Sequence, residues 1–189
     1  QYDNNWVIRE NKGLNFGTQP PSIFNTAMFE TRFAAGCYSD SAGRLLFYTD
    51  ADSIWNSKHE VMQDGSVQYK NWCYRAGVII IPVPSKPKHY YLFASGGVEY
   101  YIFKNHASNV GCTGPVPLGV MEIDMSTNNG LGSVVKPFAP LFEGHCFSIN
   151  ASYHQNQKDI WIITHTRDSL LSFLVTDTGI LPPVKTYTG

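Results

Sequence analysis

Charged side chains are scarce in this sequence. Only 15% of its 189 residues are Asp, Glu, Lys or Arg, and the formal net charge is −1. An ordinary soluble domain has roughly 25% charged residues. No run of Lys and Arg is present to displace the counterions of a polyanion, so we expect no nucleic-acid partner.

Long apolar runs and helical periodicity are also lacking. The longest apolar run, Val78–Val83, already contains Pro82, whereas a membrane-spanning helix needs ~20 apolar residues. We therefore expect no membrane insertion. No stretch shows the i, i+3, i+4, i+7 spacing of an amphipathic helix. The chain opens at Gln1 without a Met, which predicts that an N-terminal segment has been removed.

The usual metal and nucleophile motifs are missing. The four cysteines form no CxxC pair, and the chain has no HxH, HExxH or GxSxG sequence. We expect no metal, no cofactor and no catalytic residue. Cys73 and Cys112 lie in loop-like sequence and are the favoured disulfide pair, which export permits. Cys37 and Cys146 begin apolar stretches and are interpreted as small buried hydrophobes.

The sequence is instead rich in aromatics, at 14%, and in short apolar runs that favour strands. One hairpin occurs three times, at 36–49, 77–94 and 145–164, as an apolar strand, a polar turn and an aromatic-rich strand. Two further short strands follow each hairpin. Four antiparallel strands, repeated, are typical of propeller blades. We predict an all-β fold, a partial β-propeller of about three to four blades, with a β-sandwich as the alternative.

The chain, 1–189, is predicted to be a single propeller-like domain or a fragment of a larger propeller, with an inserted loop at about 95–117. Aromatic side chains cluster in this loop and in the one before it. Such side chains suit recognition of a protein partner or a glycan, and the alternative is packing within the blades. The loop aromatics predicted to bind are Trp72, Tyr74, Tyr100, Tyr101 and Phe103.

A pair of carboxylates supports an alternative in which the protein is an enzyme. Glu122 and Asp124 alternate along one predicted strand and share a face, and two such groups at the right separation hydrolyse glycosidic bonds. The alternative function is therefore a propeller-type carbohydrate-active enzyme. Asp40, Asp50 and Asp52 lie beside turns, where Asp bonds its own backbone, and are interpreted as turn residues.

Several runs, in order, resemble one protein family. They are NNWVIRENKGLNFGTQPPS, GRLLFYTDADSIWNSKHEVM, GVIIIPVPSKPKHYYLFAS, VMEIDMSTNNGLGSVV and KDIWIITHTRDSLLSFLVTDTGI. They are similar to the propeller-like N-terminal region of exported Bacteroidetes proteins associated with gliding motility and type IX secretion.

The resemblance implies a non-catalytic binding or scaffolding domain of a secreted or cell-surface protein, exported through the periplasm. It implies a cargo or accessory component of type IX secretion, with a role in gliding or adhesion and a protein partner or larger assembly. It also implies O-glycosylation where Asp-Ser precedes a small or aliphatic residue, at predicted turns. The candidate sites are Ser41, Ser53 and Ser169.

Overall fold

The computed structural model describes residues 4–8, 10–28, 34–66, 75–96, 117–144, 146 and 148–189. Over these residues the chain forms sixteen strands and one short 3₁₀ turn, η1, so the predicted all-β class is confirmed. No helix in this described part has the length and apolar character to cross a membrane.

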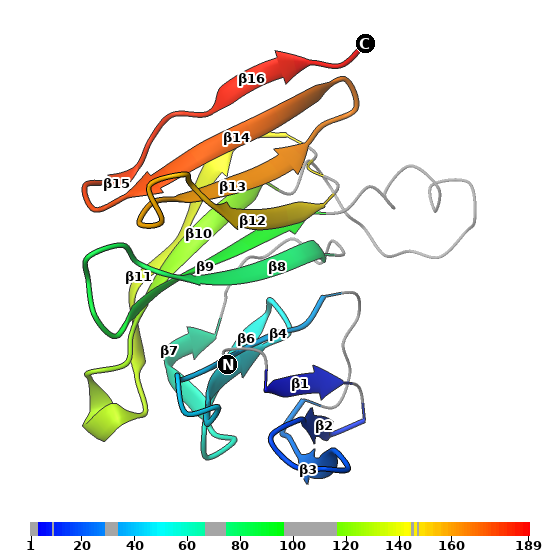
Figure 1. Cartoon of the computed structure of the whole chain (residues 1–189), viewed down its shortest axis with the longest axis vertical. Coiled ribbons are helices and arrows are strands. Elements are labelled where there is room, and N and C mark those ends of the chain that lie inside the picture. The colour runs from blue at the N-terminus through cyan, green and yellow to red at the C-terminus, as the bar shows by residue number, and fades with distance from the viewer. Residues whose placement is uncertain are drawn as a thin grey trace.

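The strands form three sheets, of three, eight and five strands (Figure 1). The eight-stranded sheet joins two consecutive groups of four antiparallel strands, so we describe the chain as four units, in chain order. Unit 1 is β1 (Asn5–Ile8), β2 (Lys12–Asn15) and β3 (Ser22–Asn25). Unit 2 is β4 (Gly36–Ser39), β5 (Leu45–Thr49), β6 (Ser53–Asn56) and β7 (Val61–Ser66). Unit 3 is β8 (Arg75–Pro82), β9 (His89–Gly96), β10 (Leu118–Asp124) and β11 (Ser133–Phe142), with η1 (Asn128–Gly130) between the last two. Unit 4 is β12 (Ile149–Tyr153), β13 (Ile160–His165), β14 (Ser169–Thr176), β15 (Gly179–Ile180) and β16 (Val184–Tyr187).

The three predicted hairpins are confirmed as β4–β5, β8–β9 and β12–β13, each continued by further antiparallel strands. In unit 4 two short strands, β15 and β16, take the place of a single fourth strand, and each pairs with a different part of β14. The third hairpin begins later than predicted, at Ile149. Unit 1 has three strands that belong to none of the predicted hairpins, since its short runs of alternating side chains carry a weak signal.

The first strands of successive units are neighbours in space. β1 contacts β4, β4 contacts β8, and β8 contacts β12. Units 2 and 3 also meet at their last strands, where Ser133 of β11 pairs in parallel with Gln63 of β7. The units therefore follow one another in a row, with their first strands on a common side.

The core lies in three clusters, one at each interface between consecutive units. Val7, Met28 and Tyr48 pack between units 1 and 2. Phe47, Ile54, Leu92 and Ile123 belong to the cluster between units 2 and 3, and Phe93, Leu118, Ile162 and Phe173 belong to the cluster between units 3 and 4.

The position of strand β9 in the fold explains why its sequence is a continuous apolar run and does not alternate between apolar and polar residues. Side chains point to opposite faces along a strand. Leu92 and Ala94 pack toward unit 2, whereas Tyr91 and Phe93 pack toward unit 4. Both faces of unit 3 are thus buried, which requires apolar residues at consecutive positions.

Candidate functional site

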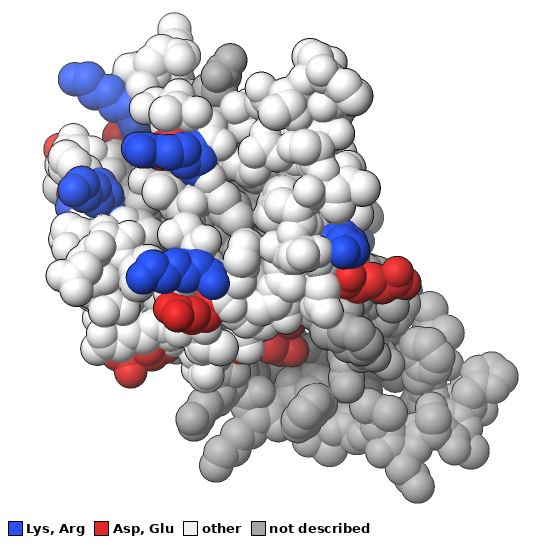
Figure 2. Space-filling model, turned by 90° about the horizontal axis from the view of Figure 1, so that it is seen from below, with Lys and Arg blue, Asp and Glu red and all other residues white. Residues whose placement is uncertain are grey.

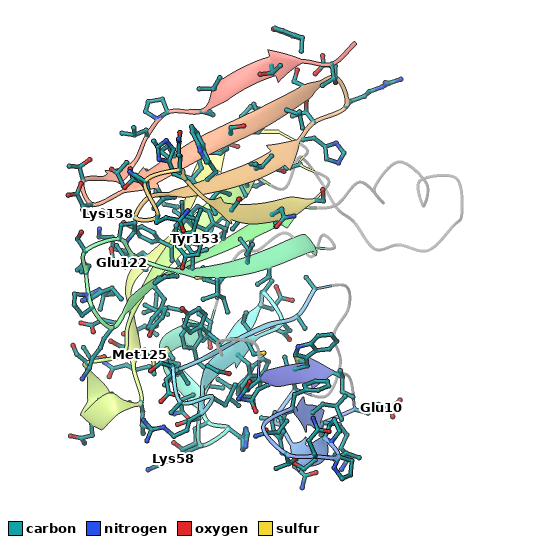
Figure 3. The ribbon with its side chains drawn as sticks, in the orientation of Figure 1. Glu10, Lys58, Glu122, Met125, Tyr153 and Lys158 are labelled. Carbon is teal, nitrogen blue, oxygen red and sulfur yellow. The ribbon has the colours of Figure 1, made fainter. Side chains whose placement is uncertain are left out.

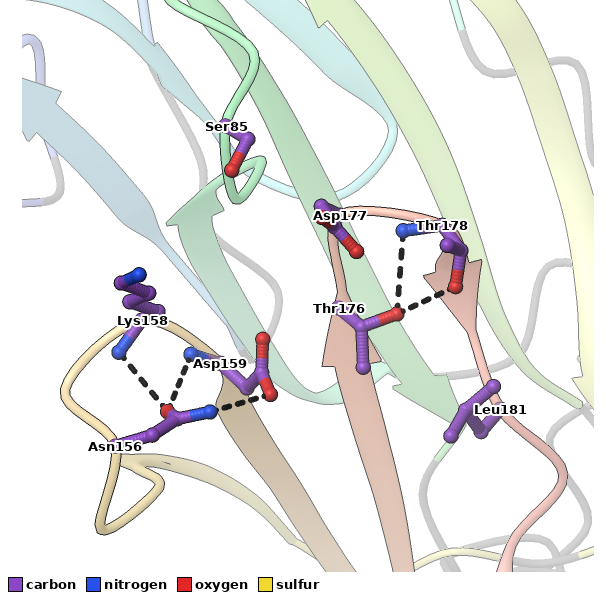
Figure 4. Close-up of a pocket in the computed structure, with 8 residues that line it drawn as sticks. All are labelled: Ser85, Asn156, Lys158, Asp159, Thr176, Asp177, Thr178 and Leu181. Carbon is purple, nitrogen blue, oxygen red and sulfur yellow. Dashed lines mark hydrogen bonds between the residues drawn. The ribbon is translucent and has the colours of Figure 1, made fainter.

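The β8–β9 turn, residues 84–88, stands between two depressions. One has a volume of about 400 Å³ and is lined by turns of units 3 and 4 (Figure 4). There the side chain of Asn156 accepts hydrogen bonds of 3.0 Å from the main-chain N–H groups of Lys158 and Asp159. Thr176 accepts one of 3.2 Å from the N–H of Thr178. These polar groups are engaged in shaping their own turns.

The other depression, of about 340 Å³, is more promising for binding, and we call it the tyrosine pocket. It combines aromatic and basic side chains from units 2, 3 and 4. Tyr38 comes from β4, Tyr90 from β9 and Tyr153 from β12. The basic side chains that line it are Lys86, Lys88 and His89.

A buried carboxylate, Glu122, organises the basic side of this region. Its side chain is only 1% exposed. Lys86 donates from Nζ to Glu122 Oε1, and Nδ1 of His89 lies 2.9 Å from the same oxygen. On the other side, Lys136 Nζ lies 2.7 Å from Oε2, as an ion pair rather than a hydrogen bond of regular geometry.

The charge state of Glu122 follows from these contacts. Burial raises the pKa of the carboxyl group, but the close contacts with the positively charged Lys136 and Lys86 outweigh burial and hold the pKa below its ordinary value. The same contact raises the pKa of Lys136. Glu122 is therefore an ionised anchor that orders Lys86 and His89.

Asp124 lies beside Glu122, as the alternation along β10 predicts. Its Oδ2 is 3.4 Å from Nε2 of His89, and its Oδ1 accepts a hydrogen bond of 2.6 Å from the hydroxyl of Ser126. His89 thus bridges the two carboxylates. Figure 3 shows Glu122 and Tyr153 on the side of the molecule where the β8–β9 hairpin turns.

On the face shown in Figure 2, the Lys and Arg side chains are spaced apart among uncharged residues, and some have an acidic side chain beside them. Among the residues that the structure describes, no group of three or more His, Cys, Asp or Glu is placed to hold a metal ion.

The residues that the sequence selected for binding cannot be placed. Most of the predicted insertion also lies outside the described residues, since of 95–117 only Ser95, Gly96 and Pro117 are described. The predicted residues that lie outside the described ranges are Trp72, Tyr74, Tyr100, Tyr101 and Phe103, together with the pair Cys73 and Cys112. Those predictions stay predictions.

The other two cysteines, Cys37 and Cys146, are in the thiol form, and Sγ of Cys37 donates a hydrogen bond of 2.7 Å to the main-chain carbonyl of Asn5. Cys146 is fully buried, as predicted, and burial raises its pKa. Cys37 is only half-buried and packs against the cluster between units 1 and 2. The sequence interpretation therefore holds for one thiol and in part for the other.

The three candidate glycosylation serines differ in exposure. Ser41 is exposed in the turn before β5. Ser53 and Ser169 are the first residues of β6 and β14 rather than turn residues, because the preceding turns end at them. Ser169 is 1% exposed and donates a hydrogen bond of 2.8 Å to Asp168. A sugar on Ser169 would have to displace this packing, whereas Ser41 is open to solvent.

The turn interpretation of two of the aspartates agrees with the hydrogen bonds. Asp40 Oδ1 accepts from the N–H groups of Ala42 and Arg44, each at 2.9 Å. Asp50 Oδ1 accepts from the N–H groups of Asp52 and Ser53.

Sequence reasoning missed the tyrosine pocket. Its tyrosines lie within strands, or at the ends of strands, and were not among the residues predicted to bind. The one available signal was the concentration of basic residues in the SKPKH turn, residues 85–89. Comparison of the chain with family models, curated proteins and solved structures finds no match.

Proposed function

We propose that this chain is part of a β-propeller and acts as a non-catalytic binding or scaffolding domain of an exported or cell-surface protein. Support comes from the arrangement of its units: their first strands adjoin in series, and a core cluster fills each interface. The alternative β-sandwich has a single interface between two sheets. Three successive interfaces favour the propeller, with the four units as its blades.

The observation that supports docking is the apolar outer face of unit 1, defined as Trp6, Ile8, Phe16 and Ile23. Cross-strand register places Trp6, Leu14 and Ile23 on one face, opposite the buried Val7. Trp6 is 57% exposed and Ile23 is 70% exposed. The rings of Trp6 and Phe16 lie 5.2 Å apart. Large contiguous apolar surfaces are rare on monomers and mark interaction sites.

Unit 4 presents a second exposed face of the same kind, with Ile163, Leu170 and Val184. The faces that units 2, 3 and 4 turn toward one another are instead covered by the neighbouring unit. We infer that the outer faces of units 1 and 4 dock a protein partner or a larger assembly. Aromatic anchors such as Trp6 dominate the energy of such contacts.

The cellular assignment rests on the resemblance of the repeated sequence runs alone. On this resemblance we assign the protein as a cargo or accessory component of type IX secretion. It would be exported through the periplasm to the cell surface and have a role in gliding or adhesion. O-glycosylation of Ser41 belongs to the same proposal. Intact-mass measurement of the natively purified protein, showing no added hexose, would contradict the glycosylation.

Docking through unit 1 is tested by sedimentation of the purified chain over a wide range of concentration. We expect the wild type to associate as concentration rises, and the double variant Trp6→Glu, Ile23→Glu to stay monomeric. Val61→Glu is the matched control, because Val61 is an exposed apolar residue on β7 of unit 2 and does not belong to the outer face of unit 1. A wild type that remains monomeric and matches both variants contradicts docking of a second copy of this chain through this face.

The enzymatic alternative is tested separately by a screen for glycan hydrolysis. Our proposal expects none. Hydrolysis that disappears in Glu122→Gln would favour the carbohydrate-active enzyme instead, with Glu122 and Asp124 as its carboxylates.

A further inference from the structure

The tyrosine pocket has features of a small-molecule site that are distinct from the docking faces. Its volume of about 340 Å³ falls within the range of ligand pockets. It is lined from three units, near the ends of β4, β8 and β12. These are first strands, which adjoin in series. The pocket therefore forms only when the units pack together.

The aromatic side chains of the pocket include two half-buried rings and one that is exposed to solvent. Tyr38 and Tyr90 have ring centroids 4.7 Å apart, and Tyr90 also packs edge-on against Phe47, 5.5 Å away. Both tyrosines are half-buried, so their rings are held in place. Tyr153, in contrast, is 57% exposed at the end of β12. Tyrosine offers a flat apolar face with a hydroxyl at one end and loses little conformational entropy on binding.

The opposite wall is basic. Lys86 and Lys88 line the pocket with His89, and none of the described lining side chains is acidic. Glu122 is not part of the lining and is shared between Lys86 and Lys136. Counted together, the charges of Lys86, Lys88 and Lys136 exceed those of Glu122 and Asp124, which leaves the region net positive. The exposed Lys88 stands on the fixed turn between β8 and β9.

From this arrangement we propose that the tyrosine pocket binds an acidic sugar, a pyranose that carries a carboxylate. The apolar face of the sugar ring packs on Tyr153, and the carboxylate points to Lys86 and Lys88. A pocket of this size holds one or two sugar units. This goes beyond the docking proposed for units 1 and 4, and it uses different residues, so either function can fail without the other.

The test is calorimetric titration of the full chain with a short oligogalacturonate and, in parallel, with a neutral glucan of equal length. We expect the acidic oligomer to bind more tightly and its affinity to fall as salt is added. Tyr153→Ala should weaken binding about two- to twelvefold, since one aromatic contact is worth about 0.5–1.5 kcal/mol. Lys88→Met should weaken the acidic oligomer about threefold at low salt and leave the neutral one unchanged.

Tyr187→Ala is the matched control, because Tyr187 is also an exposed tyrosine, on β16, and does not line the pocket. Its affinity should equal that of the wild type. The proposal is overturned if millimolar oligogalacturonate does not bind, if the neutral glucan binds as tightly, or if Tyr187→Ala loses as much affinity as Tyr153→Ala. Circular dichroism on each variant shows that a loss of binding is not a loss of fold.

Discussion

Replacing Glu122 by Gln tests how the buried carboxylate stabilises unit 3. The side chain is 1% exposed and is contacted by Lys86, His89 and Lys136. The substitution keeps the volume and removes the charge. Breaking a fully buried ion pair costs about 3–5 kcal/mol, because the remaining charge stays buried. Here Lys86 and Lys136 are 48% and 68% exposed and can turn to water, so we expect a loss of about 1–3 kcal/mol at neutral pH.

The pH dependence gives this prediction a second, independent signature. The folded state lowers the pKa of Glu122 below its ordinary value of 4.5. The carboxylate therefore contributes its full stability above pH 4.5, and the contribution disappears as the pH falls through the lowered value. The stability difference between wild type and Glu122→Gln should be constant near neutrality and shrink in acid.

Urea unfolding followed by tryptophan fluorescence, from neutral to acidic pH, measures both quantities. Glu143→Gln is the control, because Glu143 is exposed and its substitution should change stability by less than about 0.5 kcal/mol. Our reasoning is refuted if Glu122→Gln is as stable as this control. It is equally refuted if the stability difference stays constant down to a pH well below 4.5.

Four further substitutions probe two unit interfaces and two turns, each by the same unfolding assay. Phe173→Ala should cost about 3–5 kcal/mol, because it leaves a cavity in the fully buried cluster between units 3 and 4; a loss below 1 kcal/mol would show that this interface contributes little. Tyr48→Phe should cost about 1 kcal/mol, because the hydroxyl accepts a hydrogen bond of 2.8 Å from the N–H of Ala27 and links units 1 and 2. Gly43→Ala should cost more than Gly130→Ala. Both glycines have positive φ, but only at Gly43 would the new Cβ meet a side chain, 2.1 Å away; equal losses would mean that backbone strain alone acts.

Local patterns were sufficient to predict most of the strands. The run from 89 to 94, HYYLFA, and the run from 160 to 164, IWIIT, each form a strand, because aromatic and β-branched residues suit a pleated sheet. Polar turns between them then dictate antiparallel hairpins. Unit 1 was under-predicted because its three strands have four residues each and few buried side chains.

The candidate site was less accessible to the sequence. Glu122 and Asp124 were expected to share a face, and they do, since alternation along β10 is a local property. Their partner Lys86 is 36 positions away in the sequence from Glu122. It contacts Glu122 only because the β8–β9 turn folds over the neighbouring strand.

The sequence by itself therefore determined the strands, the hairpins and their repetition, because those depend on side-chain alternation and turn chemistry within a few residues. Tertiary structure decided which faces meet. It buried both sides of β9, left the outer faces of units 1 and 4 exposed, and brought Tyr38, Tyr90 and Tyr153 to one pocket. Those outcomes depend on how separate units pack against one another, and no local pattern encodes a contact between side chains that lie far apart along the chain.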